Sequence, residues 1–374
     1  MRRRDWLKSM HLGAAATMPA LVPSSASAGP STLPGVTSRT GIQGVCAWPN
    51  LLLLNDGSLV VLVFNQPCHG FWEGDLDCWA SEDEGRTWRF RGRAAGHEPT
   101  TNRMNRSAGI ANNGDVVVLC SGWADRSPKG QLSGPKRRML RAWASRSLDG
   151  GRNWSISKEF PTPPETPAGK NNEFIPFGSI RAANDGSLCS SVYLARGNLR
   201  ECYLLRSRDD GYTWGDRVPL NLAGNETDIL PLGGGHWLAA SREFQEKRDV
   251  RVELLVSDDD AYTWKRRMPL SLPMQIPGNL TRLADGRILL GYGNRCWNNF
   301  GVDVRLSDDR GQTWSPPIRI ADCPRPDCGY PSSVQLSDGR VVTAYYTQIS
   351  DDFHYEMRTA VWDPRRFGAD GRPA

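Results

Sequence analysis

Side chains able to carry chemistry are concentrated in short polar segments that separate long apolar runs. The segment 65–75 combines a histidine with two carboxylates, and the segment 97–106 combines a histidine with two arginines. Histidine transfers protons near neutral pH, and polar, ionisable and aromatic groups gathered around one opening suit a carbohydrate pocket. The candidates in these segments are His69, Glu73, Asp75, His97, Arg103 and Arg106. An isolated histidine is more often structural, so a structural role for either histidine stays open.

Further candidates lie singly in the second half of the chain. Glu226 follows an asparagine, Arg242 follows an apolar run, Arg295 follows Asn294, and Tyr330 follows a glycine. They are separated by tens of residues. Only a fold that brings distant segments to one place can use them together.

Five octapeptides of similar sequence indicate how that place is built. They occupy residues 81–88, 147–154, 207–214, 257–264 and 307–314, starting 66, 60, 50 and 50 residues apart. In each octapeptide, the Ser and Asp side chains are suited to bind nearby backbone amides. The fifth residue, which is glycine in four of the five copies, is expected to take a positive φ, and the Trp is expected to pack between neighbouring sheets. Calcium is the alternative for so many aspartates, but the EF-hand spacing with its closing glutamate is absent.

A second repeat alternates with the first. Asn-Gly, Asp-Gly or Gly-Gly turns end at Gly57, Gly114, Gly186, Gly235, Gly286 and Gly339, and an apolar run follows each. Such dipeptides between apolar runs predict β-hairpins. Six copies predict an all-β, six-bladed β-propeller, each blade being a four-stranded meander A to D. The sixth blade lacks an octapeptide, so we expect residues 36–44 to supply its outer strand.

The alternation of strand directions predicts one working face. The turns between A and B and between C and D lie on one face, so polar groups at the start of A strands and the end of B strands lie on the other. Loops on a rigid scaffold are where functional groups are expected. All the candidates named above fall on this predicted face.

The octapeptides resemble the Asp box, and the chain resembles sialidases (neuraminidases). The segment 225–232 followed by 240–242 is similar to the part that carries the Glu base and the second arginine in that family, and 329–334 is similar to the part with the nucleophilic Tyr. The resemblance implies a catalytic Tyr330 and Glu226, with Arg242 binding substrate. An alternative is that these are merely polar residues of the opening. A neutral Tyr nucleophile avoids repulsion by a substrate carboxylate.

The resemblance is incomplete at the arginines that bind the substrate carboxylate. Ala47 stands where the first is expected, and residues 299–301 (Asn-Phe-Gly) stand where the third is expected. Arg103, Arg106 or Arg295 could compensate. For the acid and base, Asp75 is the nearer match and Glu73 the second, with His69 and His97 as alternatives.

The N-terminus predicts export. Arg2 to Lys8, an apolar stretch and small residues up to Ala28 resemble a twin-arginine signal peptide, so we expect 1–28 to be removed and 29–374 to form a single propeller domain in the periplasm or outside a bacterial cell. Removal takes four basic and one acidic residue and lowers the net charge from +5 to +2. We expect no membrane span in the mature chain.

Composition narrows the expected partners. Basic residues are scattered among almost as many acidic ones, which argues against a nucleic-acid partner. No zinc motif is present among the nine cysteines, so we expect no metal and no cofactor; Cys323 and Cys328 suit a disulfide. We expect a monomer that acts on a glycan.

Three functions remain open at this stage. The leading hypothesis is an exo-acting glycoside hydrolase that releases sialic acid or another α-linked, acidic or neutral, terminal sugar. The second is a propeller-type polysaccharide lyase or rhamnose-releasing enzyme that uses His, Tyr and Arg. The third is a glycan-binding propeller without catalysis, because fold alone does not specify function.

Overall fold

A computed structural model describes residues 35–46, 48–129, 138–161, 173–196, 199–246, 249–351 and 353–368, which lie within the unit Thr32–Ala374. These residues are almost entirely β-structure, with no α-helix and one short 3₁₀ turn, Pro364–Arg366. The all-β prediction is therefore confirmed. The expected signal peptide 1–28 and Ala47 lie outside the described residues.

The strands form antiparallel meanders in chain order. The first contains β2 (Asn50–Leu53), β3 (Leu59–Phe64), β4 (Leu76–Ser81) and β5 (Arg89–Ala95). An eight-stranded sheet contains β6 (Asn105–Ile110), β7 (Val116–Ser121), β8 (Trp143–Ser147) and β9 (Ser155–Ser157), then β10 (Ile175–Ala182), β11 (Leu188–Arg196), β12 (Leu199–Ser207) and β13 (Gly215–Asn221). Its two halves are joined by parallel pairing of Gly178 with Ser107 and Ser179 with Ala108.

The remaining strands form three four-stranded sheets. One contains β14 (Gly224–Gly233), β15 (His236–Glu246), β16 (Asp249–Ser257) and β17 (Lys265–Pro269), and the next β18 (Gln275–Arg282), β19 (Ile288–Asn294), β20 (Gly301–Ser307) and β21 (Ile318–Asp322). The last contains β22 (Cys328–Gln335), β23 (Val341–Ser350) and β24 (His354–Trp362), with β1 (Val36–Gln43) paired to β24. The expected closure by the chain start is thus confirmed.

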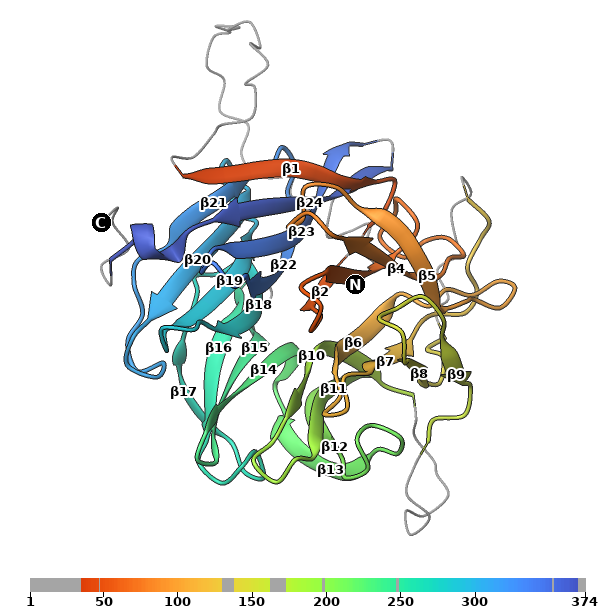
Figure 1. Ribbon diagram of the computed structural model, residues 1–374, viewed down its shortest axis with the longest axis horizontal. Helices are drawn as coiled ribbons and strands as arrows, with labels where there is room; N and C mark the ends of the chain where they lie inside the picture. Colours follow the sequence, from red (N-terminus) through yellow and green to blue (C-terminus); the bar gives the residue numbers. More distant parts are fainter. Residues whose placement is uncertain are drawn as a thin grey trace, which may run out of the picture. The chain divides into compact units, whose positions relative to one another are not determined.

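The first strands of the meanders meet around a common centre (Figure 1). β2 contacts β6, and the contacts continue through β10, β14, β18 and β22 back to β2. This arrangement is that of a β-propeller. The count of six blades stays a prediction, because the eight strands from β6 through β13 are hydrogen-bonded into a single sheet.

The octapeptide turns have the expected local structure. In all five, the fifth residue donates its N–H to the serine hydroxyl at 2.7 to 3.0 Å, and the seventh donates its N–H to the aspartate at 2.8 to 2.9 Å. Trp214 is 1% exposed, which fits the predicted packing of the turn tryptophan. The aspartates are therefore occupied in shaping turns.

A buried carboxylate ties three first strands together at the centre. Asp228 of β14 accepts hydrogen bonds from the backbone of Ser179 in β10 and from Asn279 and the backbone of Leu280 in β18, each at 2.8 Å. Asp228 is 1% exposed. Since each donor lies on a neighbouring strand, the ring depends on this side chain being fully hydrogen-bonded.

The cysteines depart from one expectation. Cys323 and Cys328 are not joined by a disulfide; the two interact through a side-chain hydrogen bond instead. Cys328 is the first residue of β22, and its Sγ also lies 3.9 Å from the carbonyl oxygens of Asn294 and Gly301. The allowed disulfide is not formed.

The described residues offer neither a membrane-spanning helix nor a metal-binding cluster. No helix there has the length and apolar character needed to cross a bilayer. Within the same ranges, no group of three or more His, Cys, Asp or Glu side chains is placed to hold a metal ion.

Candidate functional site

Four of the first strands carry an irregularity close to where they begin. The register shifts between Phe177 and Ile180 in β10, between Gly224 and Thr227 in β14, between Gln275 and Gly278 in β18, and between Gly329 and Ser332 in β22. Such bulges release residues from the ladder and redirect their side chains. Glu226 and Tyr330 both lie in these interruptions, which is how two strand residues come to point at one another.

The centre of the candidate site is a contact between these two residues. The Tyr330 hydroxyl donates a 2.6 Å hydrogen bond to Glu226 Oε1. Arg242, near the end of β15, pairs with Glu226 Oε2 and lies 3.4 Å from the Tyr330 oxygen. The Glu226 side chain is 12% exposed and the Arg242 side chain 19%, so the cluster is mostly buried but reachable.

The protonation states suit a nucleophile and its base. Burial raises the pKa of Tyr330 well above its usual range, and the neighbouring Glu226 charge adds to the effect, so the phenol is neutral. Burial alone would raise the pKa of Glu226 as well, but the charge of Arg242 and the Tyr330 hydrogen bond outweigh it and lower this pKa. An ionised Glu226 can therefore accept the Tyr330 proton.

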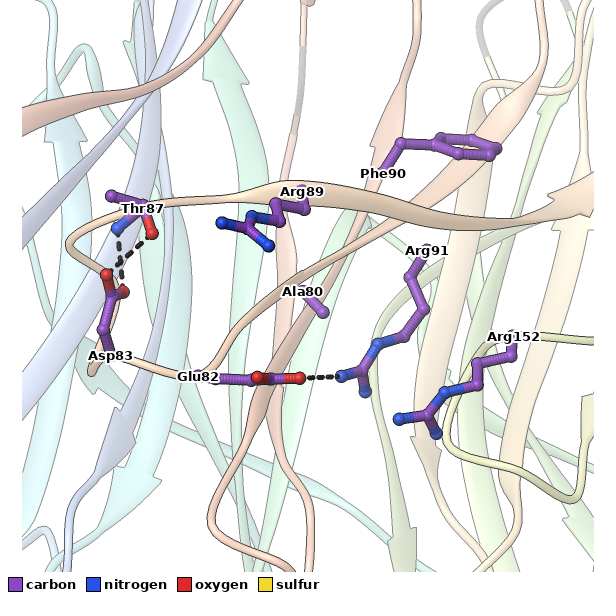
Figure 2. Close-up of a pocket in the computed structure, with 8 residues that line it drawn as sticks. All are labelled: Ala80, Glu82, Asp83, Thr87, Arg89, Phe90, Arg91 and Arg152. Atoms are coloured by element: carbon purple, nitrogen blue, oxygen red, sulfur yellow. Dashed lines mark hydrogen bonds and ion pairs between the residues drawn. The ribbon is translucent and has the colours of Figure 1, made fainter.

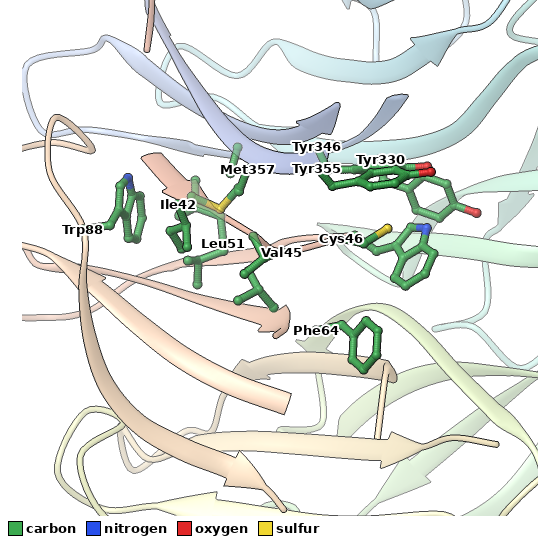
Figure 3. Close-up of a cluster of buried hydrophobic side chains, with 14 of the residues drawn as sticks. Ile42, Val45, Cys46, Leu51, Phe64, Trp88, Tyr330, Tyr346, Tyr355 and Met357 are labelled. Carbon is green, nitrogen blue, oxygen red and sulfur yellow. The ribbon is translucent and has the colours of Figure 1, made fainter. Parts of the chain in front are cut away.

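Arg295 and Asp327 extend the cluster on the other side of the Tyr330 ring. The Arg295 guanidinium lies 5.4 Å from the centre of that ring, and its Nη2 donates to the Tyr346 hydroxyl at 2.9 Å. Tyr346 and Tyr355 donate to the two oxygens of Asp327 at 2.5 and 2.8 Å. Figure 3 shows the rings of Tyr330, Tyr346 and Tyr355 close together at one end of the buried cluster.

Aromatic side chains enclose the nucleophile candidate. Trp48 meets Tyr330 edge-on with ring centres 5.9 Å apart, and Phe177 does so at 6.0 Å. Trp48 also meets His69 edge-on at 4.7 Å. Tyr330 and Trp48 have φ values of 49° and 38°, a backbone region that disfavours bulky residues. Strain of this kind is concentrated at functional sites.

The carboxylates of the first polar segment are used elsewhere. Asp75 Oδ1 accepts from the backbone N–H and the Nδ1 of His97, at 2.8 and 2.6 Å, and Asp75 Oδ2 lies 3.0 Å from Arg93. Glu73 accepts from the backbone N–H of Thr100. Across the described ranges, no hydrogen bond or ion pair links Asp75 or Glu73 to Tyr330 or Glu226. A catalytic role for either carboxylate stays a prediction.

The two remaining arginine candidates are buried and differ in position. Arg103 stacks on Trp143, 3.3 Å from the ring centre, and donates to the carbonyl of Arg141. Arg106 donates to the carbonyls of Met104 and Leu62, and it lies close enough to Tyr330 for the two groups to influence each other's pKa. Burial lowers the pKa of Arg106 to about 9. Of the two, Arg106 is therefore associated with the Tyr330 cluster.

A family model described as the BNR repeat-like domain matches residues 116–343, which is more than half of the chain. This stretch contains four of the five octapeptides and both central residues, Glu226 and Tyr330. The chain belongs to the BNR repeat-like domain family. No curated protein sequence matches it.

Solved structures similar to this BNR repeat-like chain share its fold. A Dyadobacter fermentans protein of unknown function has 22% identity and a TM-score of 0.70, with 88% of this chain and all of that chain covered. The Hadza microbial sialidase Hz136 has 16% identity and a TM-score of 0.65, with 86% and 66% covered. The NanB sialidase of Streptococcus pneumoniae has 12% identity and a TM-score of 0.65, with 87% and 70% covered. At these identities the likeness establishes the propeller fold alone.

Of the two positions at which this BNR repeat-like chain lacks an expected arginine, the structure describes the second. The third arginine position falls at Asn299 and Phe300, and Asn299 there accepts from Arg319 of the outer strand β21. Arg319 is itself paired with Asp303 and Asp322. Arg295 is the arginine of this sheet that reaches the Tyr330 ring.

Sequence reasoning missed several side chains of this site. Asp327 lies just before β22, and Trp48 lies just before β2. Both strands are the first of their sheets, so the expectation that functional groups lie where such strands begin could have included these two residues. Tyr346 and Tyr355 lie inside β23 and β24 among other buried residues, and nothing in their spacing distinguishes them from core residues.

A pocket of about 570 Å³ lies at the opposite end of the strands, around the first octapeptide turn of the BNR repeat-like fold (Figure 2). Its charged groups are largely engaged with each other or with the turn: Arg91 pairs with Glu82, and Asp83 binds Thr87. None of the candidate residues lines it: the lining residues are Ala80, Glu82, Asp83, Thr87, Arg89, Phe90, Arg91 and Arg152.

Proposed function

We propose that this protein is an exo-acting glycoside hydrolase in which Tyr330 is the nucleophile and Glu226 its base. The observation that carries the proposal is the 2.6 Å hydrogen bond from the Tyr330 hydroxyl to Glu226 Oε1. A phenol is a weak nucleophile at its ordinary pKa and needs an adjacent base to take its proton. The sialidase resemblance of the segments around both residues supports the same pairing.

The substrate is a glycan with an α-linked terminal sugar. Arg242 and Arg295 both lie at Tyr330, which favours an acidic or hydroxyl-rich sugar. Both arginines also have a carboxylate neighbour in the protein, Glu226 and Asp327. These carboxylates already balance part of the positive charge of the arginines, so the site does not require a negatively charged sugar. We therefore propose two substrate classes, glycans that end in sialic acid and glycans that end in another α-linked sugar.

A glycan release screen with product analysis tests the proposal. Wild-type protein is expected to release a monosaccharide, and Tyr330→Phe and Glu226→Gln are each expected to lose about a hundredfold or more in turnover. Tyr345→Phe is the matched control, since Tyr345 is also buried but its hydroxyl bonds to Ser38 away from the site. Full turnover by Tyr330→Phe contradicts the assignment of the nucleophile.

Product chemistry separates the two other functions. An unsaturated product that absorbs ultraviolet light identifies a lyase. Glycan binding that survives Tyr330→Phe combined with Glu226→Gln, without release of sugar by wild type, identifies a binding propeller.

We also propose export, on the sequence of residues 1–28. Sequencing the N-terminus of the protein recovered from the periplasm or medium of a bacterial host tests it. A mature chain that starts near residue 29 is expected, and a chain retained in the cytoplasm with Met1 contradicts it.

A further inference from the structure

A histidine–carboxylate pair lies beside Tyr330 and has no part in the function proposed so far. His69 Nδ1 lies 3.0 Å from Asp327 Oδ2. The His69 side chain is 16% exposed and that of Asp327 is 22% exposed. Trp48 contacts both His69 and Tyr330, and Asp327 is three residues before Tyr330 in the chain. The pair therefore lies close to the nucleophile candidate, and both of its side chains are partly exposed.

The segment that carries His69 is held rigidly. The flanking Gly70 carbonyl accepts from Asn102 and Arg126, which are 0% and 3% exposed. Cys68 and Gly70 each donate a backbone N–H within the segment at 2.8 Å. A histidine positioned in this way can keep one ring nitrogen on Asp327 and direct the other, Nε2, away from it.

Asp327 is placed to keep a negative charge. Burial would raise the pKa of Asp327, but the charge and hydrogen bond of His69 and the charge of Arg295 outweigh it and hold this pKa far below its usual range. The titratable groups that contact Asp327 besides His69 are Arg295 at the end of β19, Tyr346 of β23 and Tyr355 of β24. The thiols of Cys46 and Cys68 lie behind them, close to Tyr355. An ionised carboxylate beside an imidazole favours its protonated form.

The carboxylates expected to act as the acid are committed to other contacts. Asp75 holds His97 and Arg93, and Glu73 holds the Thr100 amide. Within the described residues, Glu226 is the carboxylate that contacts Tyr330, and neither Asp75 nor Glu73 has a hydrogen bond to Tyr330 or Glu226. His69 is a further group able to donate a proton, and it lies near Tyr330 on the other side of their shared neighbour Trp48.

We propose that His69 is the general acid and base of this site and that Asp327 is its positioning residue, an inference that rests on the hydrolase function. In the first step the Tyr330 oxygen bonds to the anomeric carbon, Glu226 takes the phenol proton, and His69 Nε2 gives its proton to the departing glycosidic oxygen. In the second step water attacks the anomeric carbon and gives a proton to His69, while the Tyr330 oxygen leaves and regains its proton from Glu226. Protons and electron pairs balance over the cycle.

Leaving-group dependence tests the role of His69. The probes are the 2,4-dinitrophenyl and methyl glycosides of the sugar that wild type releases, because dinitrophenolate departs without protonation and methoxide does not. His69→Gln is expected to lose about a hundredfold or more on the methyl glycoside. On the dinitrophenyl glycoside, azide is added because it attacks the anomeric carbon in the second step without needing a base. The loss of activity by His69→Gln is then expected to stay below about tenfold, a size that slightly altered substrate positioning can cause.

The pH profile tests the role of Asp327. Asp327→Asn removes the charge that favours the protonated imidazole, so the basic limb of kcat/KM is expected to move to lower pH. A purely structural role would lower the rate at all pH values without moving the limb. His236 and Asp258 form a matched pair at 2.6 Å on the opposite face, so His236→Gln and Asp258→Asn are controls expected to leave both readouts unchanged.

The outcomes separate this inference from the proposed function. Equal losses by His69→Gln on both probes, or an unmoved basic limb in Asp327→Asn, overturn the pair. The pair is also overturned if Asp75→Asn loses activity on the methyl glycoside but not on the dinitrophenyl glycoside, while His69→Gln does not show this difference. Absence of any released sugar from wild type overturns the hydrolase function, and the inference with it, whereas a Tyr330-dependent release with unaffected His69→Gln overturns the inference alone.

Discussion

The Tyr330 hydroxyl reaches Glu226 across the centre of the propeller, from β22 to β14, although 104 residues separate the two in the chain. The contact exists because both residues lie in bulges near the start of first strands, where side chains leave the strand ladder. A hydrogen bond between a neutral phenol and an ionised carboxylate is the arrangement that proton transfer from Tyr330 requires. Its dependence on Arg242 gives the first prediction.

Arg242→Ala is expected to shift the acid limb of the pH–rate profile to higher pH. Arg242 lowers the pKa of Glu226 against the opposite effect of burial. Without the arginine this pKa rises, so Glu226 becomes protonated and unable to act as base at a higher pH than in wild type. Kinetics over a pH series measure the shift, with the exposed Arg267→Ala in the same sheet as control. An acid limb that does not move would show that Glu226 is not the titrating base.

Asp228→Ala is expected to destabilise the propeller by at least about 3 kcal/mol. The substitution leaves three buried donors on β10 and β18 without their acceptor, and each unsatisfied group costs about 1 to 3 kcal/mol. Asp228→Asn retains oxygen on one side and should cost less. Urea unfolding followed by tryptophan fluorescence measures both. Equal stability of wild type and Asp228→Ala would contradict a central role for this carboxylate.

Asp309→Ala is expected to destabilise the fifth octapeptide turn far more than Asp308→Ala. Asp309 accepts from the Ser307 hydroxyl and from the backbone and hydroxyl of Thr313, at 2.6 to 2.9 Å, whereas its neighbour Asp308 is exposed. Several local hydrogen bonds at about 0.5 to 1.5 kcal/mol each give an expected loss of about 1 to 3 kcal/mol. Thermal unfolding of the two variants provides the comparison, and similar melting temperatures would refute it.

Asp149→Asn is expected to reduce stability at neutral pH but not near pH 2. Hydrogen bonds from the Asn153 backbone, then its side chain, and from Ser147 lower the pKa of Asp149 to about 2, against a value of about 3.9 in an unfolded chain. A depressed folded-state pKa stabilises above the unfolded value, and this contribution is lost as pH falls from about 4 to about 2. Unfolding free energies of wild type and variant should therefore converge over that window. A difference that stays constant with pH would exclude ionisation as its source.

Much of the fold was predictable because its signals are local. An octapeptide such as 207–214 specifies its own turn through hydrogen bonds between residues two to four positions apart. The alternating turns then set strand order and direction, and hence the face on which Glu226, Arg242, Arg295 and Tyr330 lie. The strand Val36–Gln43 was predictable by the same count, since one sheet was short of an outer strand.

The pairing of side chains within the site required the tertiary structure. Asp75 was a reasonable candidate acid by position, yet it turns to His97 and Arg93, while Asp327 gathers His69, Tyr346 and Tyr355 from three other strands or loops. Such contacts join residues far apart in the chain, and they depend on bulges that redirect side chains and on the closure of the ring. The sequence by itself determined the turns and the order of the strands, and from these the ends of the strands at which Glu226, Arg242, Arg295 and Tyr330 were expected, because turns and strand alternation are local properties. Only the packing of distant strands decided which of them meet.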